Sequence, residues 1–494
     1  MNTKHKSPSI IDALIPIVLL IVMLSMSVYL YGDDSSYGAN QIALILCASI
    51  AALIGMKNGY TWKEMESGII KGISMGMGAI LILLAVGALI GTWIMSGTVP
   101  AMIYYGLKIL SPSIFYFAAC IICALSAISI GSSWTVAGTL GVALIGIALG
   151  LGLSPEITAG AIISGAYFGD KMSPLSDTTN LAPAIAGTDL FTHIRHMIWT
   201  TGPSLIIALI LFLILGFQPT SEGDTAGLAI IQDTIINSFN ISMLSFIPLV
   251  IVFVLAYKKV PAFPTVLIGA LLGGIFAVFL QPQVISNFVN DPQLSKSLTM
   301  LSGVWTALHS GFSFNSGVEV VDALLTRGGM SSMLNTIWLV ICALTFGAVL
   351  ETTGLLNIIV KSLLTFAKST SSLIVTTIAT CIGVNIITAD QYISIVIPGR
   401  MYKTEFARRK LAPKNLSRTL EDAGTITSPL IPWNTCGAYM SASLGIATFA
   451  YLPFCFFNLA NPIVAIIYGL LNIKIEKIDE ETLENLKTAN TANS

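Results

Sequence analysis

The sequence predicts an all-α protein that crosses a membrane many times and contains an internal repeat. The first observation is composition: of 494 residues, 54% are hydrophobic and 10% are charged, whereas soluble domains carry about 25% charged residues. The second is a series of apolar stretches close to the roughly 20 residues that a helix needs to cross a bilayer. The third is a polar motif, S-P-L followed by Asn beside Thr, that occurs twice within otherwise apolar sequence.

Eight apolar stretches are candidate membrane spans in contact with the lipid bilayer. They are residues 10–31, 40–56, 73–95, 197–217, 240–257, 261–281, 334–352 and 449–472. The formal net charge of -1 argues against nucleic acid as a partner.

Positive charge predicts which side each loop faces, because cytoplasmic loops are enriched in Lys and Arg. Basic residues occur at Lys4 and Lys6, in the loop with Lys57, Lys63 and Lys71, at Lys258 and Lys259, and at Lys474 and Lys477. These segments are expected inside, and the acidic segment 32–39 outside. Both termini are therefore predicted to be cytoplasmic.

Two regions, 113–186 and 371–446, are interrupted by polar residues and prolines, and they resemble each other. The S-P-L motif lies at Ser173–Leu175 in the first and at Ser428–Leu430 in the second. A further polar break precedes each motif, at 132–135 and at 385–391. Irregular backbone at membrane depth is tolerated only where protein buries it or where it lines a cavity, so we expect the functional site at these breaks.

Charge predicts that the two copies are inverted. The loop after the upstream break carries seven basic residues in the second copy, from Arg400 to Arg418, and none in the first, from Gly150 to Glu156. We therefore expect two re-entrant hairpins, 113–149 and 371–399, that enter from opposite sides, and two broken helices, 157–186 and 422–446. This gives about ten spans plus two hairpins. The alternative makes each hairpin two ordinary spans.

The predicted organisation has five parts. They are N-terminal spans (1–72), a first repeat (73–217), connecting spans and a loop (218–333), a second repeat (334–472) and a polar C-terminal tail (473–494).

Carboxylates at or near the breaks are the main candidates for function, because ionisable groups inside a membrane are costly. They are Asp170, Asp177, Asp390 and Asp422. Asp177 lies within a break. Asp170 could instead form a structural ion pair with Lys171, and Asp422 could cap a helix.

Hydroxyl and amide oxygens accompany these carboxylates, and a hard cation such as Na+ prefers oxygen ligands. The candidate ligands are Thr178, Thr179 and Asn180 in the first break, Asn434 and Thr435 in the second, and Ser133 and Thr135 at the first hairpin tip. The two tip residues could instead satisfy backbone carbonyls. We expect Na+ at Asp177, Thr178 and Asn180.

Proton and Na+ can compete for a partly buried carboxylate, since burial favours its neutral form. A site that moves with either ion, but not empty, is sufficient for antiport. The sequence therefore predicts a secondary transporter that exchanges Na+ for H+ by alternating access. It shows no nucleophile–base pair and no metal-ligand motif that would indicate an enzyme.

The run from Gly169 to Pro183, G-D-K-M-S-P-L-S-D-T-T-N-L-A-P, resembles the NhaC family of bacterial Na+/H+ antiporters. The run from Arg327 to Met333 is similar to the same family. The resemblance implies a bacterial cytoplasmic membrane protein without cofactors, a homodimer, and an elevator-type movement of a transport domain beside a scaffold. In the second copy, Ile431–Trp433 stands where the first has Asp177, which leaves open whether that half binds an ion.

The family also contains exchangers similar to malate/lactate antiporters, which implies an alternative function. An organic acid would need a cationic pocket or the N–H groups at a helix N-terminus. Lys171 is the candidate basic residue within a break. The alternative is therefore an antiporter of malate or lactate coupled to Na+ and H+.

Overall fold

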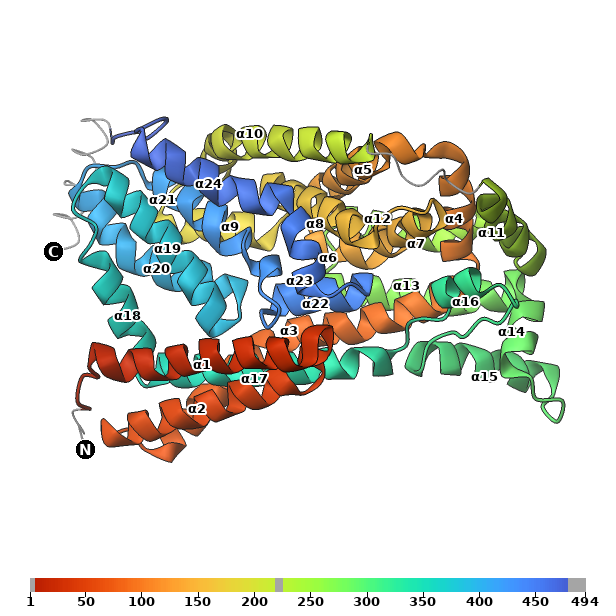
Figure 1. Cartoon of the computed structure of the whole chain (residues 1–494), viewed down its shortest axis with the longest axis horizontal. Coiled ribbons are helices and arrows are strands. Elements are labelled where there is room, and N and C mark those ends of the chain that lie inside the picture. Colours follow the sequence, from red (N-terminus) through yellow and green to blue (C-terminus); the bar gives the residue numbers. More distant parts are fainter. Residues whose placement is uncertain (1–4, 218–224, 479–494) are drawn as a thin grey trace.

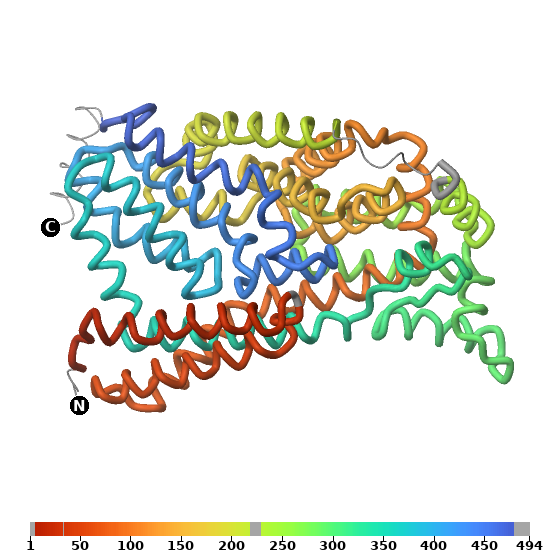
Figure 2. The backbone as a smooth tube through the Cα atoms, in the orientation of Figure 1, coloured from red at the N-terminus to blue at the C-terminus, as the bar shows by residue number. Residues whose placement is uncertain are grey.

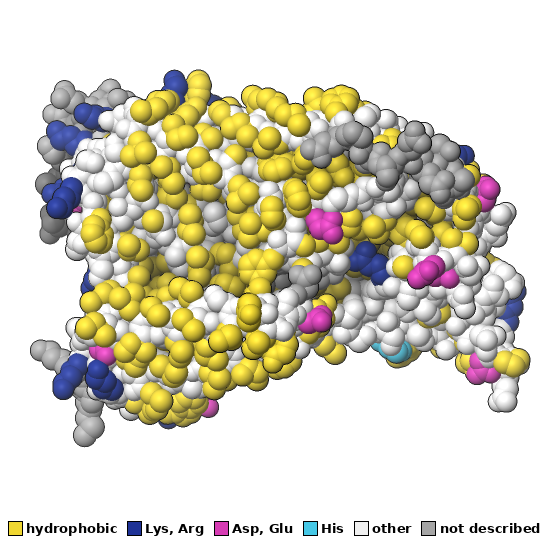
Figure 3. All heavy atoms as spheres, in the orientation of Figure 1, with side chains coloured by type: hydrophobic (Ala, Val, Ile, Leu, Met, Phe, Trp, Pro, Cys, Tyr) yellow, Lys and Arg dark blue, Asp and Glu magenta, His cyan; other side chains and the backbone are white. Residues whose placement is uncertain are grey.

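A computed structural model describes residues 5–217 and 225–478, and within them the chain forms helices and no strand. Nine of the described helices are long and apolar enough to cross a membrane, or up to eleven spans if each of two bent helix pairs counts as one. Hydrophobic side chains cover much of the face seen in Figure 3, while Lys and Arg gather at its left end. The predicted all-α polytopic class is confirmed.

The predicted spans correspond to long helices, with some shifts at their ends. They are α1 (Ile10–Tyr31), α2 (Ala39–Lys57), α3 (Trp62–Met95), α10 (Leu190–Gly216), α12 (Ile247–Tyr257), α13 (Ala262–Leu280), α17 (Leu334–Thr352) and α24 (Phe456–Leu470). α3 and α10 begin earlier than predicted, because Thr61 and Asp189 cap polar first turns that hydropathy alone leaves out. α1 begins and α24 ends toward the same end of the molecule (Figure 1).

Several shorter helices were not predicted. They are α4 (Thr98–Ile109), α11 (Thr225–Ser238), α14 (Pro282–Val289), α15 (Lys296–His309), α16 (Glu319–Leu325) and α18 (Leu355–Leu364). The predicted span 449–472 is bent, with α23 (Thr448–Tyr451) preceding α24. α4 and α18 occupy equivalent places in the two copies, since each follows a glycine with left-handed backbone, Gly97 (φ 81°) or Gly354 (φ 74°). Residues 479–494 of the predicted tail lie outside the described residues.

The two predicted hairpins are present. The first joins α5 (Phe115–Ile130) to α6 (Ser133–Val136), the π-helical η3 (Ala137–Gly141) and α7 (Val142–Gly150). The second joins α19 (Thr370–Thr388) to α20 (Gln391–Arg408), which extends beyond the predicted end. Each turns at a residue with left-handed backbone, Gly131 (φ 75°) or Ala389 (φ 58°). The hairpins lie toward opposite ends of the molecule, with both tips near its middle (Figures 1 and 2).

Two helices are broken as predicted. The first is α8 (Pro155–Met172), which is interrupted at 173–176 and continues as α9 (Asp177–Ala186). The second consists of α21 (Pro413–Leu420), the π-helical η6 (Glu421–Thr425), the 3-10 turn η7 (Ser428–Leu430) and α22 (Thr435–Leu444). It begins before the predicted residue 422, because Pro413 starts a helix within the polar loop.

Each hairpin tip packs against a break. A Cβ at Gly131 would lie 2.6 Å from the Cβ of Leu175 in the first break. The carbonyl of Ala389 accepts a hydrogen bond from the backbone N–H of Thr435 in the second. Tips buried against mid-molecule breaks are those of re-entrant hairpins, and two ordinary spans would instead turn at the membrane surface.

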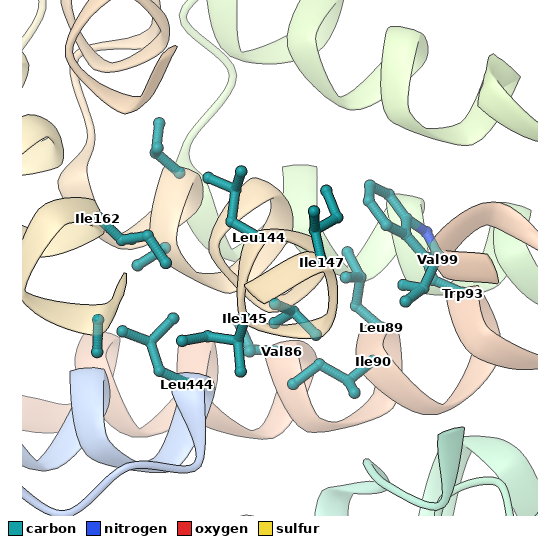
Figure 4. Packing of buried hydrophobic residues seen from close by; sticks show 14 of the residues in the cluster. Val86, Leu89, Ile90, Trp93, Val99, Leu144, Ile145, Ile147, Ile162 and Leu444 are labelled. Carbon is teal, nitrogen blue, oxygen red and sulfur yellow. The ribbon is translucent and has the colours of Figure 1, made fainter. Parts of the chain in front are cut away.

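The first hairpin is anchored by close packing. α7 lies among α3, α4, α8 and α22, where Ile145 and Ile147 pack with Val86, Ile162 and Leu444 in one buried cluster (Figure 4). α8 approaches α5 so closely that a Cβ at Gly165 would lie 2.1 Å from the Cys120 carbonyl oxygen. This contact fixes the position of Asp170, which lies on the same helix, relative to α5.

We expect Gly165→Ala to lower the thermal unfolding midpoint in detergent, because overpacking against backbone costs about 1–3 kcal/mol. Gly202→Ala is the matched control, since nothing lies within 4 Å of a Cβ there. Equal midpoints for the two variants would contradict the packing described for α5 and α8.

Candidate cation site

A cavity of about 790 Å³ lies where the first break meets both hairpin tips. Its lining includes three carboxylates, Asp170, Asp177 and Asp390, from three different elements. Ser133, Thr135, Thr178, Asn180 and Thr435 also line it. Most of the residues predicted from the sequence are therefore brought together in one place.

Asp170 is held by the tip of the first hairpin. Its Oδ2 accepts hydrogen bonds from the Ser133 backbone N–H (3.1 Å) and hydroxyl (2.6 Å). These bonds leave Oδ1 available to the cavity. Ser133 therefore orients the Asp170 carboxylate in addition to lining the cavity.

Asp177 is the first residue of α9, and its side chain is exposed within the cavity lining. The break is held by its neighbours: the Asn180 amide donates to the carbonyls of Pro174 (3.0 Å) and Ser176 (2.7 Å). The Thr179 hydroxyl donates to the carbonyls of Asp170 and Lys171. Asn180 and Thr179 thus satisfy the backbone groups that the break frees, and the Asn180 side-chain oxygen is left for a ligand.

Asp390 lies at the tip of the second hairpin and is 5% exposed. Its Oδ1 accepts a hydrogen bond from the backbone N–H of Ile393 (3.0 Å), so it caps α20. At the same position of the first hairpin, Ser132 caps by accepting from Thr135. The second copy therefore contributes a carboxylate where the first has a hydroxyl.

The cavity is acidic. Among its lining residues the one Lys or Arg is Lys259, and no ion pair joins a described Lys, Arg or His to Asp170, Asp177 or Asp390. No group of three His, Cys, Asp or Glu in the described chain is arranged to hold a metal ion. A cation here would thus combine one or two carboxylates with hydroxyl, amide and backbone oxygens, which suits Na+.

The second break is closed by amides. Asn385 donates to the Gly424 carbonyl (2.5 Å) and to Thr427 (3.1 Å), and Asn434 donates to the Asn385 side chain (3.1 Å). Asn434 also caps α22 by accepting from the Cys436 backbone N–H. This predicted ligand is therefore engaged within the protein, while its neighbour Thr435 lines the cavity.

Asp422 lies outside this cavity. It forms a fully buried ion pair with Lys171, which also donates to Asn461 (2.6 Å), and it accepts from Thr200 (2.9 Å). Asp422 is part of the π-helical η6 and not the cap of a helix. Asp170 has no ion pair with Lys171, because the two side chains leave α8 in different directions.

A second cavity of about 500 Å³ lies across α22 from the first. Thr435 of this helix lines the first cavity, whereas Ala438 and Ser441 line the second. Trp134 and Tyr439 stack between the first hairpin and α22, with ring centroids 4.1 Å apart, and the Tyr439 hydroxyl donates to the Trp134 carbonyl (2.8 Å). Trp134 lines the first cavity, and α22 contributes residues to the linings of both cavities.

Sequence reasoning missed Glu421, which is 0% exposed within η6. Glu421 follows the basic loop that ends at Arg418, and its local sequence does not distinguish a buried acid from a solvated one. It also missed Lys259, Gln391 and Tyr392 in the cavity lining. The polar break at residues 385–391 was the sequence signal that could have identified Gln391 as a cavity residue.

Comparisons with known proteins place the chain in a family. A model of the Na+/H+ antiporter family matches residues 165–473, a range that contains all three cavity carboxylates. A protein named Na+/H+ antiporter NhaC from Alkalihalophilus pseudofirmus is 41% identical over 90% of this chain and 92% of its own. The chain belongs to the Na+/H+ antiporter family.

Other members of the antiporter family carry other names. A Bacillus subtilis protein named malate-2H+/Na+-lactate antiporter is 38% identical over 94% of each chain. Among solved structures, the Alcanivorax borkumensis YdaH transporter is 12% identical over 94% of this chain and 99% of that chain, with a TM-score of 0.37. Family membership indicates that this chain is a transporter.

We expect Lys171→Gln to destabilise the protein by about 3–5 kcal/mol, because it removes the closer of the two cations that pair with the buried Asp422, the other being Arg418 at 3.9 Å. The double variant Lys171→Gln with Asp422→Asn should recover most of that loss, since both charges are removed together. Thermal unfolding in detergent measures both effects. A double variant as unstable as the sum of its single variants would contradict the buried pair.

Proposed function

We propose that this chain exchanges Na+ for H+ across a bacterial cytoplasmic membrane by alternating access. The observation that carries the proposal is the meeting of Asp170, Asp177 and Asp390 in one cavity, where none of the three forms an ion pair with a described Lys, Arg or His. Three carboxylates close together repel one another when ionised, so each has reason to bind a cation or a proton. Membership of the Na+/H+ antiporter family supports the same activity.

The proposed Na+ ligands are Asp177, Thr178 and Asn180, with Asp170 as the second carboxylate. Asp177 begins α9, and its side chain is exposed in the cavity. Asp170 keeps one oxygen for the ion while Ser133 holds the other. Asp390 adds negative charge from the opposite hairpin. Asp422 is left out of the Na+ site because Lys171 already neutralises it.

Proton and Na+ would compete for these carboxylates. The site would cross the membrane either with Na+ or with a proton, since moving it empty would carry uncompensated charge through a low-dielectric region. Each half-cycle therefore moves one kind of cation, and the two fluxes are coupled. The cycle uses the transported ions alone and needs no cofactor.

The proposed barrier between the two cavities consists of α22 and the stacked Trp134 and Tyr439. Alternating access requires that the barrier between the carboxylates and one side of the membrane opens while the barrier to the other side closes. We further propose the five-part organisation predicted from the sequence, cytoplasmic termini and a homodimer.

Exchange can be measured in proteoliposomes that contain a pH-sensitive dye and an imposed pH gradient. Addition of Na+ should dissipate the gradient for the unmodified protein. Asp177→Asn and Asp170→Asn should each slow dissipation at least about tenfold, the cost of about 1.4 kcal/mol for a weakened cation ligand. Asp291→Asn, at an exposed position outside the cavity, is the control. Full activity of Asp177→Asn would contradict the assignment.

An organic-acid antiporter is the second candidate, because one relative is named malate-2H+/Na+-lactate antiporter. The structure offers an organic acid few cationic groups. Lys171 is buried in its ion pair with Asp422, and Lys259 is the one Lys or Arg in the cavity lining. We expect no uptake of labelled malate or lactate above that of empty liposomes, with or without Na+. Na+-dependent uptake of either acid would favour the alternative.

A further inference from the structure

Glu421 is a buried carboxyl group that the exchange described above does not use. It is 0% exposed, and neither of its oxygens has a hydrogen-bond partner among the described residues. The hydroxyl of Thr425, one turn further along η6, also lacks a partner. An ionised carboxylate in such surroundings costs several kcal/mol, so this conformation favours the neutral acid.

A permanently neutral acid would normally donate its O–H to a nearby acceptor, and Glu421 has no such bond in the described chain. Neither protonation form is well satisfied here. A group that only stabilised the fold would have acquired partners. Glu421 is instead placed like a group that changes its protonation and its surroundings during a cycle.

The charges that act on Glu421 connect it to the cation cavity. Lys171 of α8 forms an ion pair with Asp422, the residue that follows Glu421, and Asp170 immediately precedes Lys171 on the same helix. Arg418 lies one turn before, with its Nε 3.9 Å from Asp422. On the neighbouring α9 and α20, Asp177 and Asp390 line the cavity. The helices α19 and α24 meet this segment with amides, Asn385 bonding to Gly424 and Asn458 to Ile426.

α8 is the link between the two places. Asp170 lines the cavity while the next residue, Lys171, reaches the buried pair beside Glu421. An empty, ionised Asp170 would strengthen proton binding at Glu421, because like charges in a low-dielectric interior repel. Na+ bound at Asp170 would remove that effect and favour release of the proton. Linkage makes the coupling reciprocal.

A line of polar groups leads from Glu421 toward the surface. Ser417, one helical turn before it, is 2.8 Å from Nδ1 of His193. His196 follows, with its Nδ1 3.7 Å from the half-exposed Glu476. The Nε2 atoms of both buried histidines have no partner in the described chain. Chains of ionisable and polar groups inside a membrane protein are typical of proton relays.

We propose that Glu421 is a second proton-binding site, separate from the cation cavity, which loses and regains one proton in each transport cycle. The O–H bond of Glu421 breaks as Na+ binds in the cavity, and the proton passes along His193 and His196 to water at the surface. After Na+ leaves, the carboxylate regains a proton from the opposite side of the membrane, so that one proton crosses in each cycle. This inference rests on the proposed Na+/H+ exchange and adds one proton to its stoichiometry.

The test is the number of protons exchanged per Na+ in proteoliposomes. Na+, pH and electrical gradients are imposed together, and the combination that gives no net flux of radioactive Na+ defines the ratio. We expect at least two protons per Na+ for the unmodified protein. Glu421→Gln should lower the ratio by one, while its half-saturating Na+ concentration stays within about threefold of that of the unmodified protein. Glu421→Asp should keep the original ratio.

Glu66→Gln, at an exposed position, is the control and should leave the ratio unchanged. A ratio of one for the unmodified protein, or an unchanged ratio in Glu421→Gln, would overturn the inference while leaving Na+/H+ exchange intact. Absence of any Na+-driven proton flux in the unmodified protein would instead refute the proposed function.

A second measurement covers the case in which Glu421→Gln does not fold. Infrared difference spectra of the unmodified protein should show a protonated carboxyl band that disappears on Na+ addition. Glu421→Asp should shift that band. A band that is unaffected by Na+, or one that Glu421→Asp leaves in place, would contradict a proton that cycles at Glu421.

Discussion

A helix that is interrupted inside a membrane must satisfy its freed backbone groups within the protein, and the rest of this structure depends on that constraint. The first break is closed by Asn180 and Thr179, and the second by Asn385 and Asn434. Each is then covered by a hairpin tip. Covering the breaks in this way brings Asp170, Asp177 and Asp390 to one cavity, although they belong to three separate elements.

α8 divides the buried charges into two groups. Asp170 faces the cavity and keeps an oxygen free, whereas Lys171 neutralises Asp422 on the other side. The pairing of Lys171 with Asp422 places this cation away from the three cavity carboxylates, and Lys259 is the one Lys or Arg in the cavity lining. The same arrangement lets charge in the cavity act on Glu421 through one helix, and binding and proton release can be coupled without a shared ligand.

Much of this architecture was predictable because the inverted repeat leaves signals in the local sequence. The repeated S-P-L motif located the breaks, and the basic loop from Arg400 to Arg418 gave the relative orientation. Interactions between distant residues left no such signal. Nothing local distinguishes Asp422, paired with Lys171, from Asp390, which lines the cavity. Glu421 was missed because a buried acid next to a basic loop has the same local sequence as a solvated one.

The most direct test of the cation site is calorimetry of Na+ binding to the purified protein in buffers with different ionisation enthalpies. The dependence of the measured heat on the buffer gives the number of protons released for each Na+ bound. The account predicts that Na+ binding releases protons, and that a variant with Asn at both Asp170 and Asp177 neither binds Na+ nor releases them. Na+ binding without proton release, or unchanged binding by the double variant, would contradict it.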